Sequence, residues 1–340
     1  MLHFESDYIE GTHPEILAYF TEVGDRKLTG YGTDEICDSA KEKIRKACNC
    51  PDAEIFFLSG GTQSNLVVIR SLLRLYEGVI SANTGHVNGH EAGAIEAGGH
   101  KVLTLPHHNG KLDPEETEQY IIGFYQDENH EHIVKPGMVY ISQPTEYGTL
   151  YSLDELQRLH EVCEKYSIPL YLDGARLGYA LASPENDMTL EDIAKYCDVF
   201  YIGGTKVGAM LGEAVVFPRH LVDGFFTIVK QSGALLAKGW ILGGQFDALF
   251  SNDLYYRCGK NAIDMAARLK EGLKEKGYTF YLESPTNQQF LILENNQLEA
   301  LKEKASFGFW EIYDPDHVVV RLATSWGTKI EEVEALLELM

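Results

Sequence analysis

The stretch that decides the fold is Leu170-Tyr171-Leu172-Asp173-Gly174-Ala175-Arg176. A short, continuous apolar run bounded by turn residues is typical of a strand buried on both faces, as in a parallel sheet. Open α/β sheets bind ligands at the carboxyl ends of their strands, which is where Asp173 would lie. Arg176 adds a planar guanidinium suited to a carboxylate ligand. Two alternatives stay open, namely a helix-capping Asp173 and a purely structural Asp173–Arg176 pair.

Four further apolar runs have the same length and character, and they cover residues 55–58, 138–141, 199–202 and 214–217. Helical patterns lie between the runs. The pattern over residues 152–166 begins with Ser152 and has Glu155 three residues later, which is a capping box. A shorter helical pattern covers residues 190–197. Strands alternating with helices predict βαβ units, and therefore an α/β fold with helices covering a sheet.

The alternation of predicted strands and helices changes toward the C-terminus. A long amphipathic segment covers residues 230–250, and a helical pattern over residues 261–276 ends before Gly277. Four short strand-like runs and a closing amphipathic helix follow, over residues 279–282, 289–293, 307–310, 318–323 and 330–340. We therefore expect a large domain over residues 1–250, including the N-terminal segment, and a small α+β domain over residues 251–340.

Composition and charge limit the classes of partner and the cellular compartment that we expect for the protein. The 340 residues suit two domains, and 29 basic against 51 acidic residues give a net charge of −22. This charge argues against nucleic acid and anionic membranes as partners. The first residues lack a signal-peptide pattern, and six scattered cysteines favour reduced thiols, so we expect a cytoplasmic protein. Cys48 and Cys50 have no further ligands nearby, and no metal site is expected.

The stretch Leu58-Ser59-Gly60-Gly61-Thr62-Gln63-Ser64-Asn65 follows one of the apolar runs and opens a helical pattern. Glycines let a backbone approach an anion, and the N–H groups at a helix start can hold a phosphate. Thr62 and Ser64 add hydroxyl donors. The alternative is an ordinary turn between a strand and a helix. The stretch matches neither the dinucleotide-binding nor the Walker pattern, which argues against a nicotinamide-dependent dehydrogenase.

A lysine ends the next stretch, Phe200-Tyr201-Ile202-Gly203-Gly204-Thr205-Lys206. Burial near the sheet edge would lower the pKa of this lysine and make its amine a better nucleophile. The alternative is a solvated loop lysine. Lys206 follows Asp173 by 33 residues (206 − 173). The three stretches together are more specific than any one of them.

Their order resembles that of pyridoxal-phosphate-dependent enzymes of fold type I, the aspartate-aminotransferase fold. Local strings resemble the threonine aldolase and β-eliminating lyase family within that fold. These strings lie along nearly the whole chain, at Ser6-Asp7, Tyr31-Gly32, His86 with Ala94–Gly99, Asp173–Leu177 and Arg321–Trp326. The resemblance implies a large domain with a mainly parallel seven-stranded sheet covered by helices, and a small C-terminal α+β domain.

The resemblance also implies how pyridoxal 5′-phosphate would be held. Lys206 would form a Schiff base with the cofactor, Asp173 would keep the ring nitrogen protonated, and His86 would stack on the ring. The phosphate would be held by Gly60, Gly61 and Thr62.

The amino-acid substrate would be held by its carboxylate, for which the resemblance implies Arg176 and Arg321, helped by Ser6. Tyr31 would line the site from a neighbouring subunit, in a homodimer or homotetramer with its active site at the subunit interface. Lys230 and Lys238 could reach a neighbour's phosphate, although solvated helix lysines are the simpler interpretation.

Two positions depart from the family pattern. Glu146 stands where threonine aldolases usually carry a histidine, and Gly-Gly-Thr-Lys replaces the commoner Ser-x-Ser-Lys. The leading hypothesis is cleavage of a β-hydroxy-α-amino acid to glycine and an aldehyde, with Glu146, His86 or water as the base. The alternatives are β-elimination or transamination of another amino acid, and a non-catalytic relative that kept the fold.

Overall fold

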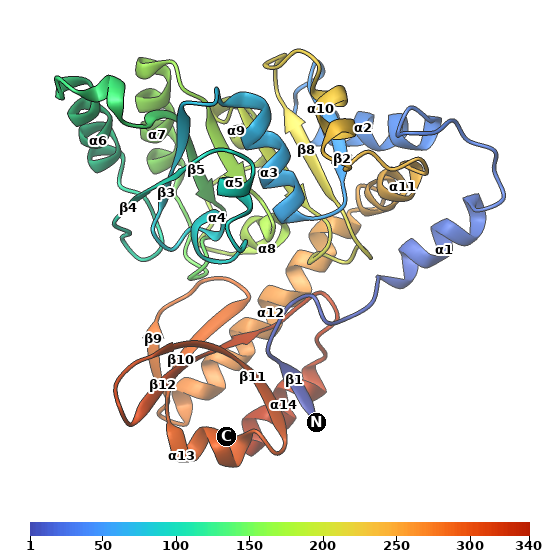
Figure 1. Ribbon diagram of the computed structural model, residues 1–340. Coiled ribbons are helices and arrows are strands. Elements are labelled where there is room, and N and C mark those ends of the chain that lie inside the picture. Colours follow the sequence, from blue (N-terminus) through green and yellow to red (C-terminus); the bar gives the residue numbers. More distant parts are fainter.

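The computed structural model describes residues 1–340, which form two sheets covered by helices (Figure 1). The first sheet has seven strands in the order β2-β8-β7-β6-β5-β3-β4. β8 alone runs opposite to the other six strands, so the predicted mainly parallel seven-stranded sheet is confirmed. The strands are β2 (Glu54–Leu58), β3 (Glu77–Ala82), β4 (Val102–Leu105), β5 (Lys135–Ser142), β6 (Leu170–Asp173), β7 (Val199–Gly203) and β8 (Glu213–Phe217).

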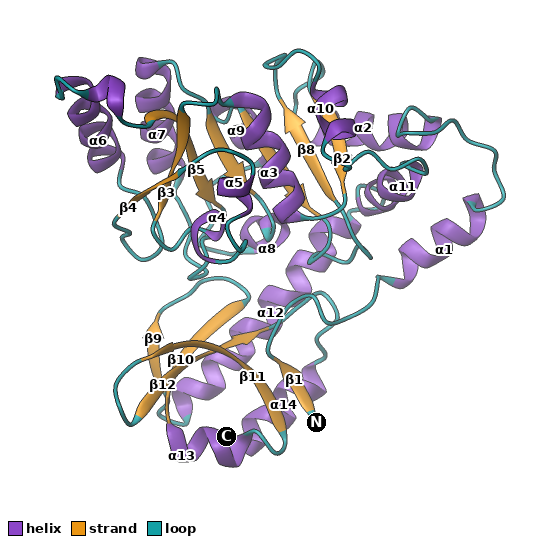
Figure 2. Ribbon diagram, viewed as in Figure 1, coloured by secondary structure: helices purple, strands orange, loops and turns teal.

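Helices cover both faces of this sheet (Figure 2). Along β6, Leu172 and Tyr171 pack into two separate apolar clusters, because successive side chains of a strand point to opposite faces. The capping box predicted at Ser152 is present. The helices are α1 (Pro14–Val23), α2 (Glu35–Ala47), α3 (Gly61–Leu72), α4 (His86–Gly89), α5 (Ala94–Ala97), α6 (Pro114–Gln126), the 3₁₀ turn His130–His132, α7 (Leu153–Tyr166), α8 (Leu177–Ala182), α9 (Leu190–Tyr196), α10 (Phe225–Gln231) and α11 (Trp240–Leu249).

The second sheet has five strands in the order β1-β11-β12-β10-β9, and it lies below the first in Figure 1, with α12 running from one to the other. Its elements are β1 (Leu2–Phe4), α12 (Leu254–Glu275), β9 (Thr279–Leu282), β10 (Gln288–Glu294), α13 (Asn295–Leu301), β11 (Ala305–Ile312), β12 (His317–Ala323) and α14 (Ile330–Leu339). Phe4, Leu269 and Leu336 belong to one apolar core beneath it.

Three expectations differ from this architecture. The N-terminal segment, assigned above to the large domain, contributes β1 to the second sheet, where β1 pairs with β11 in parallel. The amphipathic segment expected over residues 230–250 is two helices, because Gly233, in the left-handed region at φ +69°, follows the end of α10. The helix α12 begins at Leu254, earlier than the predicted residue 261. The domain boundary near residue 250 stays a prediction.

No helix of the chain combines the length and apolarity that crossing a membrane requires.

Candidate active site

The carboxyl ends of β6 and β7 and the start of α3 enclose a cavity of about 250 Å³. Eight of the residues predicted from the sequence line it, namely Gly60, Gly61, Thr62, His86, Glu146, Asp173, Arg176 and Lys206. A wider cavity of about 530 Å³ shares His86, Glu146, Arg176 and Lys206 with it and extends to Arg321. The structure thus brings together three stretches that are far apart in sequence.

Two glycines allow the ends of β6 and β7 to lie this close. A Cβ atom on Gly174 would lie 1.9 Å from the carbonyl oxygen of Tyr201, and one on Gly203 would lie 2.4 Å from that of Ala175. Both contacts are with backbone, which cannot move aside as a flexible side chain would. The glycines therefore place Asp173 and Lys206 on one wall of the cavity.

Asp173 is buried, and both of its carboxylate oxygens are hydrogen-bonded. Oδ2 accepts from the hydroxyl of Tyr140 (2.6 Å) and from Asn65 Nδ2 (3.1 Å). Oδ1 accepts from the hydroxyl of Tyr201 (2.5 Å) and from the N–H of Ala175 (2.9 Å). Burial alone would raise the pKa of Asp173, but His86 and these donors outweigh burial and lower it. Asp173 does not pair with Arg176, so the structural-pair alternative is wrong.

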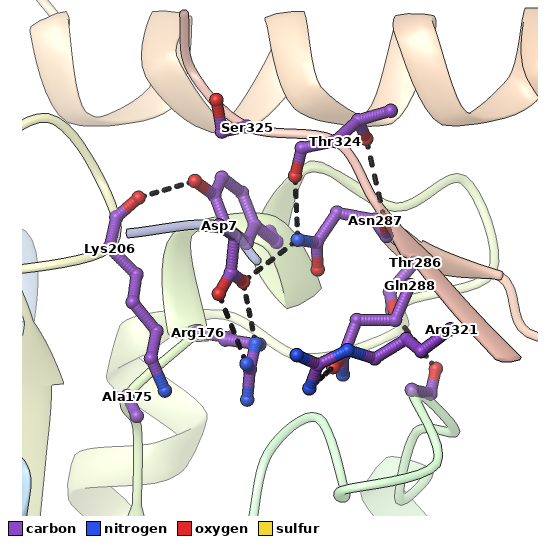
Figure 3. A network of polar contacts seen from close by, with 12 residues as sticks. Asp7, Ala175, Arg176, Lys206, Thr286, Asn287, Gln288, Arg321, Thr324 and Ser325 are labelled. Carbon is purple, nitrogen blue, oxygen red and sulfur yellow. Dashed lines mark hydrogen bonds and ion pairs between the residues drawn. The ribbon is translucent and has the colours of Figure 1, made fainter. Parts of the chain in front are cut away.

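Lys206 follows the Gly203-Gly204 turn after β7, and its side chain extends toward Ala175 (Figure 3). Its carbonyl oxygen accepts a hydrogen bond from the hydroxyl of Tyr179. Burial and the nearby Arg176 guanidinium lower the pKa of Lys206 from 10.5 to about 8. A neutral, nucleophilic amine is therefore far more accessible at Lys206 than at a solvated lysine, and the solvated-loop alternative is wrong.

The turn before Lys206 is held by a buried carboxylate, Glu213, at the start of β8. One of its oxygens accepts from the N–H of Gly204 (3.0 Å) and the other from the hydroxyl of Thr205 (2.8 Å). Burial raises the pKa of Glu213 to about 8. Glu213 was not predicted from the sequence, where it reads as one polar residue at the edge of an apolar run.

The helix α3 begins beside the same cavity with Gly60 as its N-cap. No side chain caps this helix. The first N–H groups of a helix have no partner within the helix, and they favour an anion. A Cβ atom on Gly60 would meet nothing within 4 Å, so the cavity is open beside the glycine. Gly60, Gly61 and Thr62 therefore form a cradle suited to a phosphate.

His86 and Glu146 lie together at the junction of the two cavities. The N–H of His86, the first residue of α4, donates to Glu146 Oε1 (2.8 Å), which also accepts from the hydroxyl of Ser142 (2.7 Å). Burial raises the pKa of Glu146, although the Ser142 hydroxyl opposes this effect. Glu146 therefore fixes the start of α4, and a raised pKa suits a group that exchanges protons.

Arg176 is held by Asp7, a residue with no predicted role of its own. Figure 3 shows Asp7 between Arg176 and Asn287. Arg176 Nε and Nη2 donate to the two Asp7 oxygens at 2.6 and 3.0 Å, and Asn287 Nδ2 donates to Oδ2 at 3.0 Å. Asn287 also donates to the carbonyl oxygen of Thr324 (2.8 Å). The pair thus ties the N-terminal segment to elements of both sheets.

Arg321 lies on β12 and reaches the wider cavity. It donates from Nη1 to Gln288 Oε1 (3.1 Å) and from Nη2 to the carbonyl oxygen of Glu5 (3.0 Å). Its Nε is buried and has no partner. The hydroxyl of Ser6, next in the chain to Glu5, is also buried without a partner. Burial and Arg176 lower the pKa of Arg321. Unpaired buried donors are costly, and a carboxylate ligand would satisfy them.

Tyr31 does not reach the cavity of its own chain. It is 43% exposed, with a backbone in the left-handed region at φ +63°. The ammonium of Lys230 lies 4.7 Å from the centroid of its ring, a cation–π contact. Tyr31 therefore stands on the surface together with Lys230, and its predicted place in a neighbour's site stays a prediction.

The donors around Asp173 were not predicted from the sequence. Tyr140 and Tyr201 lie inside apolar runs, within β5 and β7, and look like core residues, so no local signal suggests that their hydroxyls bind Asp173. Asn65 lies in the glycine-rich stretch, but nothing in that stretch indicates a carboxylate partner for it. Asp7 was part of a motif, but its partner Arg176 is 169 residues away.

The fold is that of pyridoxal-phosphate-dependent enzymes built like aspartate aminotransferase. An aspartate aminotransferase double mutant from Thermus thermophilus matches with a TM-score of 0.74 at 16% identity, over 100% of this chain and 90% of that chain. The chain belongs to the β-eliminating lyase family, whose model matches residues 14–296.

Two threonine aldolases are similar over almost their whole length. A low specificity L-threonine aldolase from Pseudomonas aeruginosa is 30% identical over 338 residues, which are 98% of this chain and 95% of that protein. The structure of a threonine aldolase from Leishmania major matches with a TM-score of 0.96 and 41% identity, over 100% of this chain and 98% of that chain.

Members of this family depend on pyridoxal 5′-phosphate, and the cavity fits that group. The uncapped start of α3 suits the phosphate, because no side chain competes for its N–H groups. The ionised, buried Asp173 suits a protonated ring nitrogen. Lys206, with a lowered pKa, suits the aldehyde. All three line one cavity of about 250 Å³.

Proposed function

We propose that the protein cleaves β-hydroxy-α-amino acids to glycine and an aldehyde with pyridoxal 5′-phosphate as cofactor. The observation that carries this proposal is the placing of Asp173, Lys206 and the start of α3 around one cavity, which adjoins a second cavity bearing Arg321. The family and the two threonine aldolases support it. When bound, the cofactor supplies an electron sink for the bond that breaks at the substrate Cα.

The chain would hold this cofactor at three points. The Lys206 amine would hold the cofactor covalently, and the Asp173 carboxylate would keep the ring nitrogen protonated. The N–H groups of Gly60, Gly61 and Thr62, with the Thr62 hydroxyl, would bind the phosphate. His86 would lie against the ring. The residues that line the cavity and the ionisation of Asp173 and Lys206 support these roles.

The substrate carboxylate would bind between Arg321 and Arg176, helped by Ser6. Arg321 Nε and Ser6 Oγ are the buried atoms without partners there. The Asp7 carboxylate accepts from Nε and Nη2 of Arg176 and thereby fixes the plane of its guanidinium. A fixed carboxylate would orient the Cα–Cβ bond relative to the cofactor. This orientation, rather than the strength of the bond, would decide which bond at Cα is cleaved.

A base must take the proton of the β-hydroxyl group. Glu146 and His86 both face the space that the two cavities share. Glu146 has a raised pKa, and in its ionised form it accepts a proton. His86 offers a ring nitrogen beside it, and a bound water is the third candidate.

A second copy of the chain would complete the site. Tyr31 and Lys230 form a surface pair, and Lys230 carries a cation that the phosphate cradle of one chain lacks. We propose a homodimer or homotetramer in which this pair reaches the neighbour's cavity. The six free thiols suit a reducing, cytoplasmic location.

The test uses the purified, cofactor-loaded full chain. We expect glycine and acetaldehyde from L-threonine or L-allo-threonine, and a visible absorption band that borohydride removes. Lys206→Ala should lose both the covalent attachment and the products. Release of ammonia with a keto acid, or conversion of the cofactor to its amine form, would instead indicate β-elimination or transamination. A chain that binds no cofactor would overturn the proposal.

A further inference from the structure

Glu91, in the turn between α4 and α5, is a buried carboxylate that the proposed function does not use. Its side chain has no exposed surface, and no lysine or arginine pairs with it. Oε1 accepts from Asn65 Nδ2 at 2.8 Å and lies 3.0 Å from His86 Nδ1, whereas Oε2 is buried without a partner. A buried carboxylate that pairs with no lysine or arginine is costly, so the hydrogen bonds at Oε1 are what stabilise Glu91 there.

The contact with His86 fixes which ring nitrogen carries the proton. Glu91 Oε1 acts as an acceptor, because Asn65 Nδ2 donates to the same oxygen, so His86 Nδ1 is the donor in this contact. In the neutral imidazole, Nε2 is then an acceptor. Because His86 lines both cavities and Nδ1 is engaged by Glu91, Nε2 is the ring nitrogen left for a ligand.

Asn65 fixes the position of Glu91 relative to Asp173. Its two amide hydrogens go to two carboxylates, Glu91 Oε1 at 2.8 Å and Asp173 Oδ2 at 3.1 Å. The opposite orientation of the amide would turn its oxygen toward both carboxylates, which is repulsive. The hydroxyl of Tyr171 also donates to Asn65 Oδ1 (2.8 Å). One buried amide thus holds both carboxylates.

We infer that Glu91 is a positioning residue for His86, and that it keeps Nε2 ready to accept the proton of the substrate hydroxyl. The proton leaves the hydroxyl oxygen and binds Nε2, while Nδ1 keeps its own proton. The ring then carries a positive charge, which the Glu91 carboxylate faces at 3.0 Å. This inference rests on the proposed function, and among the candidate bases it selects His86 over Glu146 and water.

A double-mutant cycle tests whether Glu91 acts through His86. Glu91→Leu removes the acceptor and should lower kcat for glycine release roughly 10- to 100-fold, as loss of groups that orient a histidine does at metal sites. Glu91→Gln should cost much less, because its amide oxygen can still accept from His86 and Asn65. In a His86→Phe background, Glu91→Leu should change kcat less than about threefold. Equal losses in both backgrounds would overturn the inference.

A second readout does not depend on turnover. In cofactor-loaded protein with ¹⁵N-labelled histidine, the resonances missing from His86→Phe identify His86. We expect a protonated Nδ1 and an unprotonated Nε2 in the wild type and in Glu91→Gln, and a mixture of tautomers in Glu91→Leu. A wild-type ring protonated at Nε2 alone would contradict the inference, even if Glu91→Leu proved unstable.

Glu77→Gln is the matched control. Glu77 is a buried glutamate of β3 that pairs with Lys135 and lines neither cavity. It should leave both the activity and the His86 spectrum unchanged. A wild type that releases no glycine from any β-hydroxy-α-amino acid would overturn the proposed function, whereas the tautomer measurement would still decide the role of Glu91.

Discussion

The two ends of the active-site region differ in how far the chain satisfies its own polar groups. At one end, the Asp173 oxygens accept four hydrogen bonds from the chain. At the other end, Arg321 Nε and Ser6 Oγ are buried without partners. The hydrogen bonds of Asp173 are complete without a ligand, whereas Arg321 Nε and Ser6 Oγ would gain partners only from a ligand.

This difference in hydrogen bonding fits how long each proposed ligand stays bound, namely the cofactor at Asp173 and the substrate at Arg321. A cofactor that stays bound is best served by a rigid, ionised carboxylate, because preorganised charge costs no reorganisation during the reaction. A substrate carboxylate enters and leaves at every turnover, so its partners must tolerate its absence. We therefore expect substitutions at the Asp173 end to act mainly on kcat, and those at the Arg321 end mainly on KM.

The largest effect is expected for Asp173→Ala. Without the carboxylate, nothing in the chain keeps the ring nitrogen protonated, and kcat should fall on the order of 10³-fold or more. The measurement is glycine release at saturating L-threonine. Asp198→Asn is the matched control, because Asp198 is also buried and accepts the N–H of Leu170 at the opposite end of β6. If Asp173→Ala lowered kcat no more than the control does, the proposed role of Asp173 at the cofactor would be contradicted.

Arg321→Met should act on substrate binding. Removing one partner of a buried charged pair costs about 2–5 kcal/mol, which corresponds to a rise in KM of roughly 30-fold to a few thousand-fold. The cofactor spectrum should stay unchanged. Arg268→Met is the control, since Arg268 of α12 makes two hydrogen bonds to Glu334 of α14 and lines neither cavity. An unchanged KM with a lowered kcat would contradict the prediction that Arg321 acts mainly on substrate binding.

The sequence predicted one end better than the other. Asp173, Lys206 and Gly60–Thr62 were identified because each follows an apolar run of strand length, and the carboxyl ends of parallel strands meet at one edge. The surroundings of Arg321 depend on contacts between distant segments. Asp7 and Asn287 meet across 280 residues, and β1 joins a sheet whose other strands begin after residue 278. No local pattern encodes such contacts.

The pKa of Lys206 gives a prediction that sets it apart from other lysines. With a pKa of about 8, about 9% of Lys206 is neutral at pH 7 and about 90% at pH 9, so its reaction with an amine reagent should rise about tenfold. Reductive methylation of the cofactor-free chain, read by peptide mass spectrometry, measures this. Arg176→Gln removes the cation that lowers the pKa and leaves Asp7 unpaired nearby, so the midpoint should move upward. A wild-type midpoint near 10.5 would contradict the prediction.

The smallest effect is expected for Tyr201→Phe, which tests how complete the Asp173 end is. This change removes one of four donors, and a hydrogen bond to a charged group contributes about 1.5–3 kcal/mol. Because Tyr140, Asn65 and the N–H of Ala175 remain, we expect the low end of this range, roughly a tenfold fall in kcat with KM unchanged. Tyr151→Phe, which alters a buried tyrosine bonded to the N–H of Leu112 outside both cavities, should leave kcat unchanged. If Tyr201→Phe reduced kcat as far as Asp173→Ala does, the four donors would act as one unit rather than as separate, partly redundant contacts.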